Sequence, residues 1–182
     1  MNRSISSKTL APSASAVVVV RPEEGRRLIG RAVAGLPQVQ ARLRSGRMVI
    51  IGGSTTRYVA WALTGEDPGL SAFAVGWIRD GQLGETPRNE RGPGPLLFEE
   101  GNQSRGWPAS LLERFGNGDI YIKGANAIDP QGNAAVLIGS PTGGTIGAAL
   151  AILQARGGEL ILPVSLQKTI PSVPAACGLL GQ

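Results

Sequence analysis

RMVIIGGSTTRYVAWALTG, residues 47–65, carries the signals of a strand, a glycine turn and a helix in immediate succession. The apolar run before the two glycines predicts a buried strand, and Ser54 or Thr55 can cap the helix that follows. Apolar residues then recur at helical spacing, and Gly65 ends the helix. The stretch is therefore half of a βαβ unit.

Similar units recur along the chain. DIYIKG, AAVLIGS and GELILPVS predict three further strands, and a helix is predicted between the last two. Another helix is predicted at residues 22–36, where Pro22 and two acids mark the start and Pro37 interrupts the pattern. Repeated strand-turn-helix units make an α/β layered fold with a mainly parallel sheet, whose ligand sites lie at the carboxyl ends of the strands.

Two other stretches are less regular. Asp80-Gly81, after an apolar run, predicts a hairpin. RNERGPGPLLFEEGNQSRG, residues 88–106, is rich in glycine, proline and charge, and we expect a long irregular loop. We expect residues 15–182 to form a single α/β domain and residues 1–14 to be a disordered tail.

Composition excludes several classes of function. The chain of 182 residues has no histidine, which removes Ser-His-Asp and Cys-His catalysis and every histidine metal site. Its single cysteine cannot form an internal disulfide, which favours a reducing, cytoplasmic location. No apolar run approaches the ~18 residues that cross a bilayer, so we expect no membrane partner. We predict no cofactor and no metal.

Positive charge is concentrated near the start of the chain. Nine of the 18 Lys and Arg lie in residues 1–50, against two Glu. No helix-turn-helix, zinc-finger or aromatic RNA-binding pattern accompanies them, so nucleic acid is not the favoured partner. A solvated helix surface and the attraction of an anionic ligand both remain open.

Two glycine turns at strand ends are candidate anion sites. The first comprises Gly52, Gly53, Ser54, Thr55 and Thr56. The second comprises Thr142, Gly143, Gly144 and Thr145. In each, glycine lets the backbone approach a ligand, and the following helix N-terminus offers unpaired N–H groups and hydroxyls. Plain helix caps are the alternative, but two turns converging on one edge would form a single polar cleft.

KGANAIDPQGN, residues 123–133, is either a binding loop or an ordinary hairpin turn. Lys123 ends a strand, and Asn126 and Asp129 follow it. Asp-Pro-Gln-Gly-Asn is a strong turn sequence in which Gly132 supplies a left-handed position. Lys123 can bind an anion or, if desolvated, act as a base, although a solvated lysine is the commoner case.

GANAIDPQGN and IIGGSTT together resemble motifs of one superfamily. It joins ribose-5-phosphate isomerase, methylthioribose-1-phosphate isomerase, glucosamine-6-phosphate deaminase, translation initiation factor 2B subunits and CoA transferases. The resemblance covers residues 47–166 and implies a Rossmann-like fold with the ligand over the strand ends. It implies that residues 53–56 hold phosphate and that Asp129, Gly132 and Asn133 shape the floor of the site. Asn126 stands where isomerase-like members have an acid, and an amide cannot act as a general base.

The resulting hypothesis is a protein that binds a small anionic metabolite, such as a phosphosugar or a CoA ester. As an enzyme it would isomerise a substrate or transfer an acyl group, with Lys123 or Asp129 as proton carrier. Glu99 and Glu100 are a paired-acid candidate for the glutamate nucleophile of CoA transferases, but the rest of that pattern is missing. The alternative is a non-catalytic binding or assembly module. Relatives in the superfamily commonly self-associate, so a homo-oligomer is expected.

Overall fold

The computed structural model describes residues 15–179, apart from the side chain of Arg79. The predicted tail at residues 1–14 lies outside this range. The elements of the first half are α1 (Pro22–Ala34), α2 (Pro37–Arg42), β1 (Arg47–Ile50), α3 (Thr56–Thr64), α4 (Leu70–Phe73), β2 (Gly76–Arg79), β3 (Gln82–Glu85) and the 3-10 helix η1 (Arg88–Glu90). Those of the second half are β4 (Leu96–Glu99), β5 (Asn102–Arg105), α5 (Ala109–Leu112), β6 (Ile120–Ile122), β7 (Ala127–Ile128), β8 (Ala134–Ala135), α6 (Gly144–Arg156), β9 (Glu159–Ile161), the 3-10 helix η2 (Leu166–Lys168) and α7 (Val173–Cys177).

A five-stranded sheet in the order β5-β4-β1-β6-β9 forms the centre of the fold. β1, β6 and β9 run parallel to one another, whereas β4 is antiparallel to β1 and to β5. The α/β class is confirmed. The sheet is mixed rather than mainly parallel, because β4 and β5 form a hairpin that adds to the free edge of β1.

Residues 88–106 are therefore not the irregular loop that their composition predicts. Leu96 and Phe98 are buried while Leu97 and Glu99 are partly exposed, so the apolar patch alternates like a strand. Glu100 and Gly101 both have positive φ (47° and 80°) and make the tight turn between β4 and β5. The Asp80-Gly81 hairpin is confirmed as β2–β3, which is a separate two-stranded sheet.

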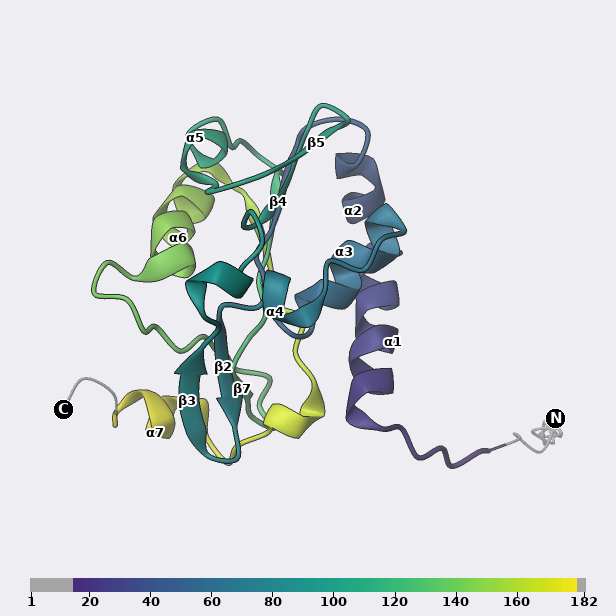
Figure 1. The fold of residues 1–182 in the computed structure, drawn as a ribbon, viewed down its shortest axis with the longest axis vertical. Coiled ribbons are helices and arrows are strands. Elements are labelled where there is room, and N and C mark those ends of the chain that lie inside the picture. Colours follow the sequence, from purple (N-terminus) through teal and green to yellow (C-terminus); the bar gives the residue numbers. More distant parts are fainter. Residues whose placement is uncertain (1–14, 180–182) are drawn as a thin grey trace, which may run out of the picture.

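Helices cover both faces of the five-stranded sheet, giving three layers (Figure 1). On one face α1–α4 pack on a core that includes Met48, Ile50, Ile120 and Ile122. On the other face α5 and α6 pack on a second core, whose members include Val49, Ile51, Tyr121, Ala149 and Leu153. Alternation of β1 and β6 residues between the two cores is what a strand buried on both faces requires.

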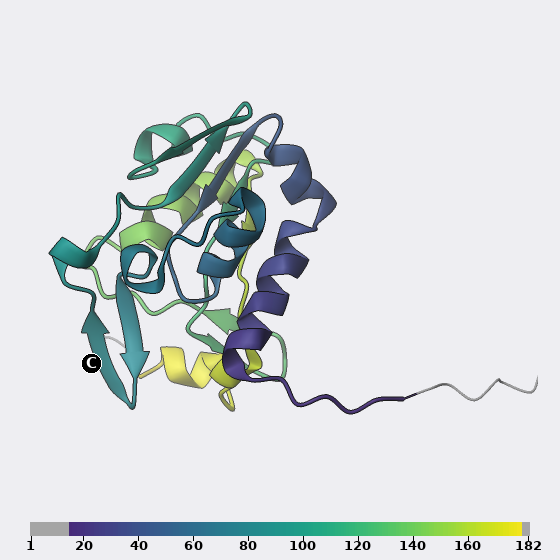
Figure 2. The ribbon, with the colours of Figure 1, turned by 45° about the vertical axis from the view of Figure 1, so that its right-hand side comes forward.

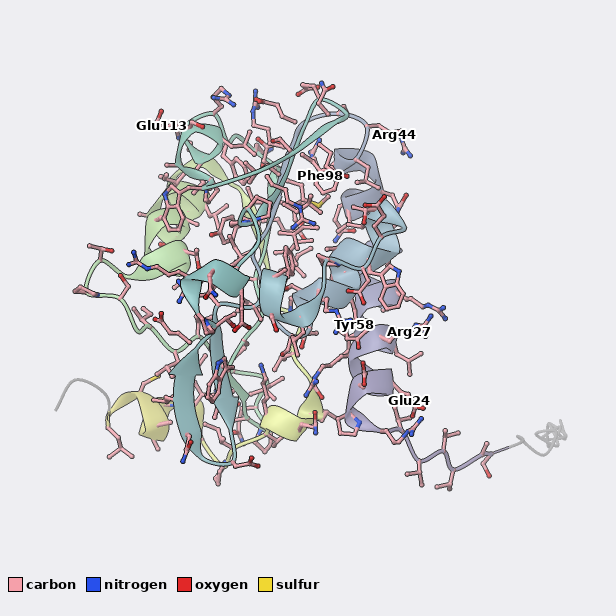
Figure 3. The ribbon with its side chains drawn as sticks, in the orientation of Figure 1. Glu24, Arg27, Arg44, Tyr58, Phe98 and Glu113 are labelled. Carbon is pink, nitrogen blue, oxygen red and sulfur yellow. The ribbon has the colours of Figure 1, made fainter. Side chains whose placement is uncertain are left out.

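α1 and α3 pack against each other very closely. A Cβ at Gly30 would lie 2.5 Å from Cβ of Tyr58, so only glycine allows this approach. The Tyr58 hydroxyl donates to Glu23 Oε1 at 2.5 Å, and burial, followed by this bond, raises the pKa of Tyr58. Arg27 lies over the Trp61 ring, 5.2 Å from its centroid. Figure 3 labels Arg27 and Tyr58 where the two helices meet.

The arginines of the basic N-terminal third have several different roles. Arg21 pairs with Glu24 on the helix surface, and Arg27 stacks on Trp61. Both arginines are exposed, which agrees with the solvated-surface interpretation for that side of α1. Residues 15–21, which precede α1, run outward from the body without regular structure (Figure 2). Arg26 of the same helix has a different environment, described below.

Candidate functional site: a cleft at the carboxyl ends of the parallel strands

Three connections leave the carboxyl ends of β1, β6 and β9 at one edge of the sheet, in the lower half of Figure 1. A cleft of about 930 Å³ lies there. Its lining includes Ser54 from the first connection, Asn126 from the second and Gln167–Ile170 from the third. α1 contributes Arg26, and the β2–β3 hairpin with η1 supplies Trp77, Ile78, Glu85 and Glu90. This is the position at which open α/β sheets bind ligands.

Arg26 and Lys168 are the basic residues of the lining. Arg26 Nη2 donates to Gln167 Oε1 at 3.2 Å, and Lys168 Nζ donates to the Ala125 carbonyl at 2.6 Å. Nε of Arg26 is buried and has no hydrogen-bond partner in the described part of the chain. Burial, and next the charge of Arg26, lowers the pKa of Lys168. Keeping Lys168 protonated therefore costs free energy in the folded protein.

Lys123 adds a third positive charge at the end of β6. The residue is mostly buried, and burial followed by the charge of Lys168 lowers its pKa. Among residues 15–179, the ion pairs involve neither lysine nor Arg26. Charges removed from water are normally paired, so three partly buried cations that take part in no described ion pair favour an anionic partner.

The first glycine turn leads from β1 into α3 beside this cleft. A Cβ on Gly52 would lie 1.7 Å from the Phe73 carbonyl oxygen, so this glycine is required by the packing of α4. Thr56 Oγ1 donates to the Ile51 carbonyl at 2.6 Å and fastens the turn. Thr55 Oγ1 is buried without a partner among residues 15–179. Within the predicted group, Ser54 lines the cleft, and Gly53 lies against Thr56, whose Oγ1 would be 3.1 Å from a Cβ at Gly53.

The 123–133 stretch is a hairpin, with β7 and β8 paired across residues 129–133. Asp129 is buried and its two oxygens accept four hydrogen bonds. The donors are the backbone N–H groups of Gln131, Asn133 and Val173 and the side-chain amide of Asn133. These bonds, that of the Asn133 side chain foremost, lower the pKa of Asp129. Gly132 has the expected positive φ of 84°. An ionised, fully engaged carboxylate is suited to anchor the turn and α7.

Asn126 lies on the cleft wall. Its Oδ1 accepts from the Leu137 N–H at 3.0 Å, and its own backbone N–H donates to the Ala135 carbonyl. The amide thereby fixes the chain after β8. AAVLIGS was expected to be a full strand, but only Ala134–Ala135 pair, and the following residues are placed by Asn126 instead.

The second glycine turn does not converge on the cleft. Gly143 (φ 79°) caps α6, and the Ser140 and Thr142 hydroxyls lie 3.0 Å apart. Thr142, Gly143, Gly144 and Thr145 are outside the cleft lining because α6 covers the opposite face of the sheet from α3. The Thr145 carbonyl accepts from the buried Tyr121 hydroxyl at 2.6 Å, which ties this turn to β6.

The paired acids Glu99 and Glu100 lie far from the cleft. Glu99 stands opposite Arg47 at the amino end of β1. Hydrogen bonds from Arg114 and then Arg47 lower the pKa of Glu99 to about 2. A carboxylate held by two arginines at the other end of the sheet has the role of an ion-pair centre.

Sequence reasoning missed Arg26 and Lys168. Arg26 lies in a run of arginines whose neighbours do face water, so the pattern did not single it out. Lys168 had a usable signal, because it follows the last parallel strand and is one of only three lysines beside fifteen arginines.

Comparisons with protein-family models, with curated proteins and with solved structures found no match to this chain. Within residues 15–179, no helix has the length and apolarity to span a membrane. The same residues contain no cluster of three His, Cys, Asp or Glu side chains suited to hold a metal ion.

Proposed function

We propose that this protein binds a small anionic metabolite, of the phosphosugar or CoA-ester class, in the cleft at the carboxyl ends of β1, β6 and β9. The observation that carries the proposal is that Arg26 and Lys168 lie together on the cleft wall and belong to none of the ion pairs of residues 15–179. Ser54 supplies a hydroxyl from the turn before α3, whose N-terminus favours negative charge.

A purely structural role explains the two cations less well. The bonds from Arg26 to Gln167 and from Lys168 to Ala125 do connect α1, η2 and the segment after β6. A neutral side chain could make the same connections without the cost of a buried charge. Perturbed ionisable groups in a cleft are more typical of ligand sites.

For chemistry, Lys123 is the better of the two predicted proton carriers. Its lowered pKa brings the neutral amine closer to working pH, as proton transfer in an isomerase requires. All four bonds to Asp129 would have to change before it could take a proton from a substrate. The proposal includes isomerisation or acyl transfer as the reaction. It also includes a Rossmann-like fold related to the isomerase and CoA transferase superfamily.

The second candidate is a binding or assembly module without turnover, such as one subunit of a homo-oligomer. Two observations favour it: the amide oxygen of Asn126 is occupied by the Leu137 N–H, and Asp129 is engaged in its turn. The carboxylates of the cleft wall, Glu85 and Glu90, belong to the β2–β3 side, and Glu85 is already paired with Arg91.

Thermal unfolding with inorganic phosphate, ribose 5-phosphate and acetyl-CoA tests the proposal. A ligand at 100 times its dissociation constant stabilises the native state by about 2.7 kcal/mol, which is a readily measured shift. Arg26→Gln is expected to remove most of the shift. Arg31→Gln is the matched control, because Arg31 lies on the exposed side of the same helix. Equal shifts in both variants, or none in the parent protein, would refute anion binding here. Conversion of a bound phosphosugar, followed by NMR, separates the enzyme from the binding module.

A further inference from the structure

We infer that Lys168 is a nucleophile that forms an imine with the aldehyde or ketone carbon of an anionic ligand in the cleft. The inference rests on the proposed function, in which Arg26 holds the anionic group of that ligand. It assigns to the site a class of substrate, the small phosphorylated or carboxylated carbonyl compounds.

The position of Lys168 supports this role. Its side chain lines the cleft, and the Ala125 carbonyl holds its Nζ at 2.6 Å from one side. η2 fixes the backbone through the Ser165 cap, whose side chain accepts from Gln167 N–H, and through the Lys168 N–H bond to the Ser165 carbonyl. The amine is therefore placed before any ligand arrives, which is what nucleophilic attack requires.

The surroundings of Lys168 suit a neutral amine. A lysine becomes nucleophilic when it is desolvated or when another cation lies beside it. Both conditions hold, because the residue is largely buried, Arg26 carries a permanent charge next to it, and Lys123 interacts with it from the end of β6. No carboxylate of residues 15–179 forms an ion pair with Lys168 to restore the charged form.

Lys168, rather than Lys123, meets the carbonyl group in this scheme. The repulsion between the two lysines is mutual, so the proton lost from the pair can come from either. Arg26 and Lys168 share the cleft lining with Asn126, whereas Lys123 is outside it. Lys123, which lies beside the lining and not in it, therefore does not form the imine.

The covalent step needs no oxidant or further reactant. The neutral Lys168 amine adds to the carbonyl carbon, giving a carbinolamine. The C–O bond of this adduct then breaks as the C=N bond forms. The two amine hydrogens leave with the carbonyl oxygen as water, so the step is balanced and reversible.

Trapping with cyanoborohydride tests the inference on the full chain. Glycolaldehyde phosphate and glycolaldehyde serve as the charged and neutral probes. Reduction converts the imine into a stable secondary amine that mass spectrometry locates on a peptide. We expect the adduct from glycolaldehyde phosphate mainly on Lys168, and its loss in Lys168→Arg but not in Lys123→Arg. Arg26→Gln is expected to lower the yield with the phosphate probe about tenfold or more relative to the yield with the neutral probe, as loss of a charged hydrogen bond to the phosphate predicts. The neutral probe reports separately any effect of the lost Arg26 charge on Lys168 itself.

An adduct spread evenly over the lysines and the α-amino group, or retained in Lys168→Arg, would overturn the inference. Phosphate-induced stabilisation without an adduct on Lys168 would refute the imine and leave the proposed anion site standing. Absence of both would refute the two together.

Discussion

Replacing Lys123 by methionine is expected to stabilise the unliganded protein. Lys123 is mostly buried, and its pKa is lowered by burial and by the charge of Lys168. Methionine keeps an unbranched apolar chain of similar length in the same space but carries no charge. The gain therefore comes from relief of desolvation and repulsion, without a new cavity.

The size of the gain follows from the class of substitution. Relieving an unfavourable charge in this way typically adds roughly 0.5–2 kcal/mol to the free energy of unfolding. For a chain of this length that corresponds to about 1–8 °C in the unfolding midpoint. Lys123→Arg keeps the charge and is the matched control, for which no gain is expected.

The gain should depend on pH in one direction. Because the folded pKa of Lys123 is below the ordinary value of 10.5, charging the group in the folded state destabilises it below that folded pKa. This penalty is relieved as the pH rises through the folded pKa toward 10.5. The advantage of methionine is thus largest near neutral pH and shrinks at alkaline pH. Urea unfolding followed by tryptophan fluorescence measures both quantities. A destabilised Lys123→Met at neutral pH, or an advantage independent of pH, would refute this reasoning.

Three further substitutions test the fold around the cleft. Gly52→Ala places a Cβ 1.7 Å from the Phe73 carbonyl oxygen. Urea unfolding should show a free energy of unfolding lower by roughly 1–3 kcal/mol or more, and phosphate binding should be weaker. An unchanged free energy of unfolding would show that α4 can move. Asp129→Asn should lower the thermal midpoint, because the new amide group faces N–H donors. The parent protein loses part of its stability as the pH falls through the lowered pKa of Asp129, and the variant should lack this loss. Acid unfolding that is the same in both proteins would contradict the anchor role of Asp129. Met48→Ala, in the fully buried core beside α1–α4, should lower the free energy of unfolding by about 2–5 kcal/mol. The cleft residues are unchanged, so the folded variant should still bind phosphate, and loss of that binding would contradict the proposed location of the site.

The elements that the sequence predicts well are those with strong local signals. The helix predicted at residues 22–36 is present as Pro22–Ala34 and ends before Pro37. Asp80-Gly81 makes the predicted hairpin with φ of 51° and 74°. The strand before Gly52 and the helix after Thr55 are both present. In each case a proline, a glycine or an apolar period acts within a few residues, and no distant contact is needed.

The features that the sequence misses depend on distant contacts. β4 and β5 pair through Glu100-Gly101, a turn that lacks the usual Asn-Gly or Asp-Gly signal. The antiparallel addition of β4 to β1 cannot be inferred from either strand alone. Arg26 and Lys168 lie 142 positions apart along the chain, and only the packing of α1 beside the β9 connection brings both into one cleft.

The candidate site residues divide in the same way. Ser54 and Asn126 were found because they follow strands, and chain position alone locates a strand end. The turn at 142–145 also follows a strand signal, but its helix α6 packs on the other face of the sheet. Which face a helix covers depends on chain crossover, and no residue in the turn encodes it.

The β2–β3 hairpin has a consequence for how this molecule can diversify. It supplies Trp77, Ile78 and Glu85 to the cleft, yet it pairs with no strand of the five-stranded sheet. Its base is closed at Thr86, whose hydroxyl and N–H donate to the carbonyls of Ala74 and Val75, the two residues before β2. Mutations along the hairpin are therefore expected to change one wall of the cleft while the wall that carries Arg26 and Lys168 keeps its geometry. If the cleft binds the proposed ligand, its preference can change through the hairpin while the five-stranded sheet stays as it is.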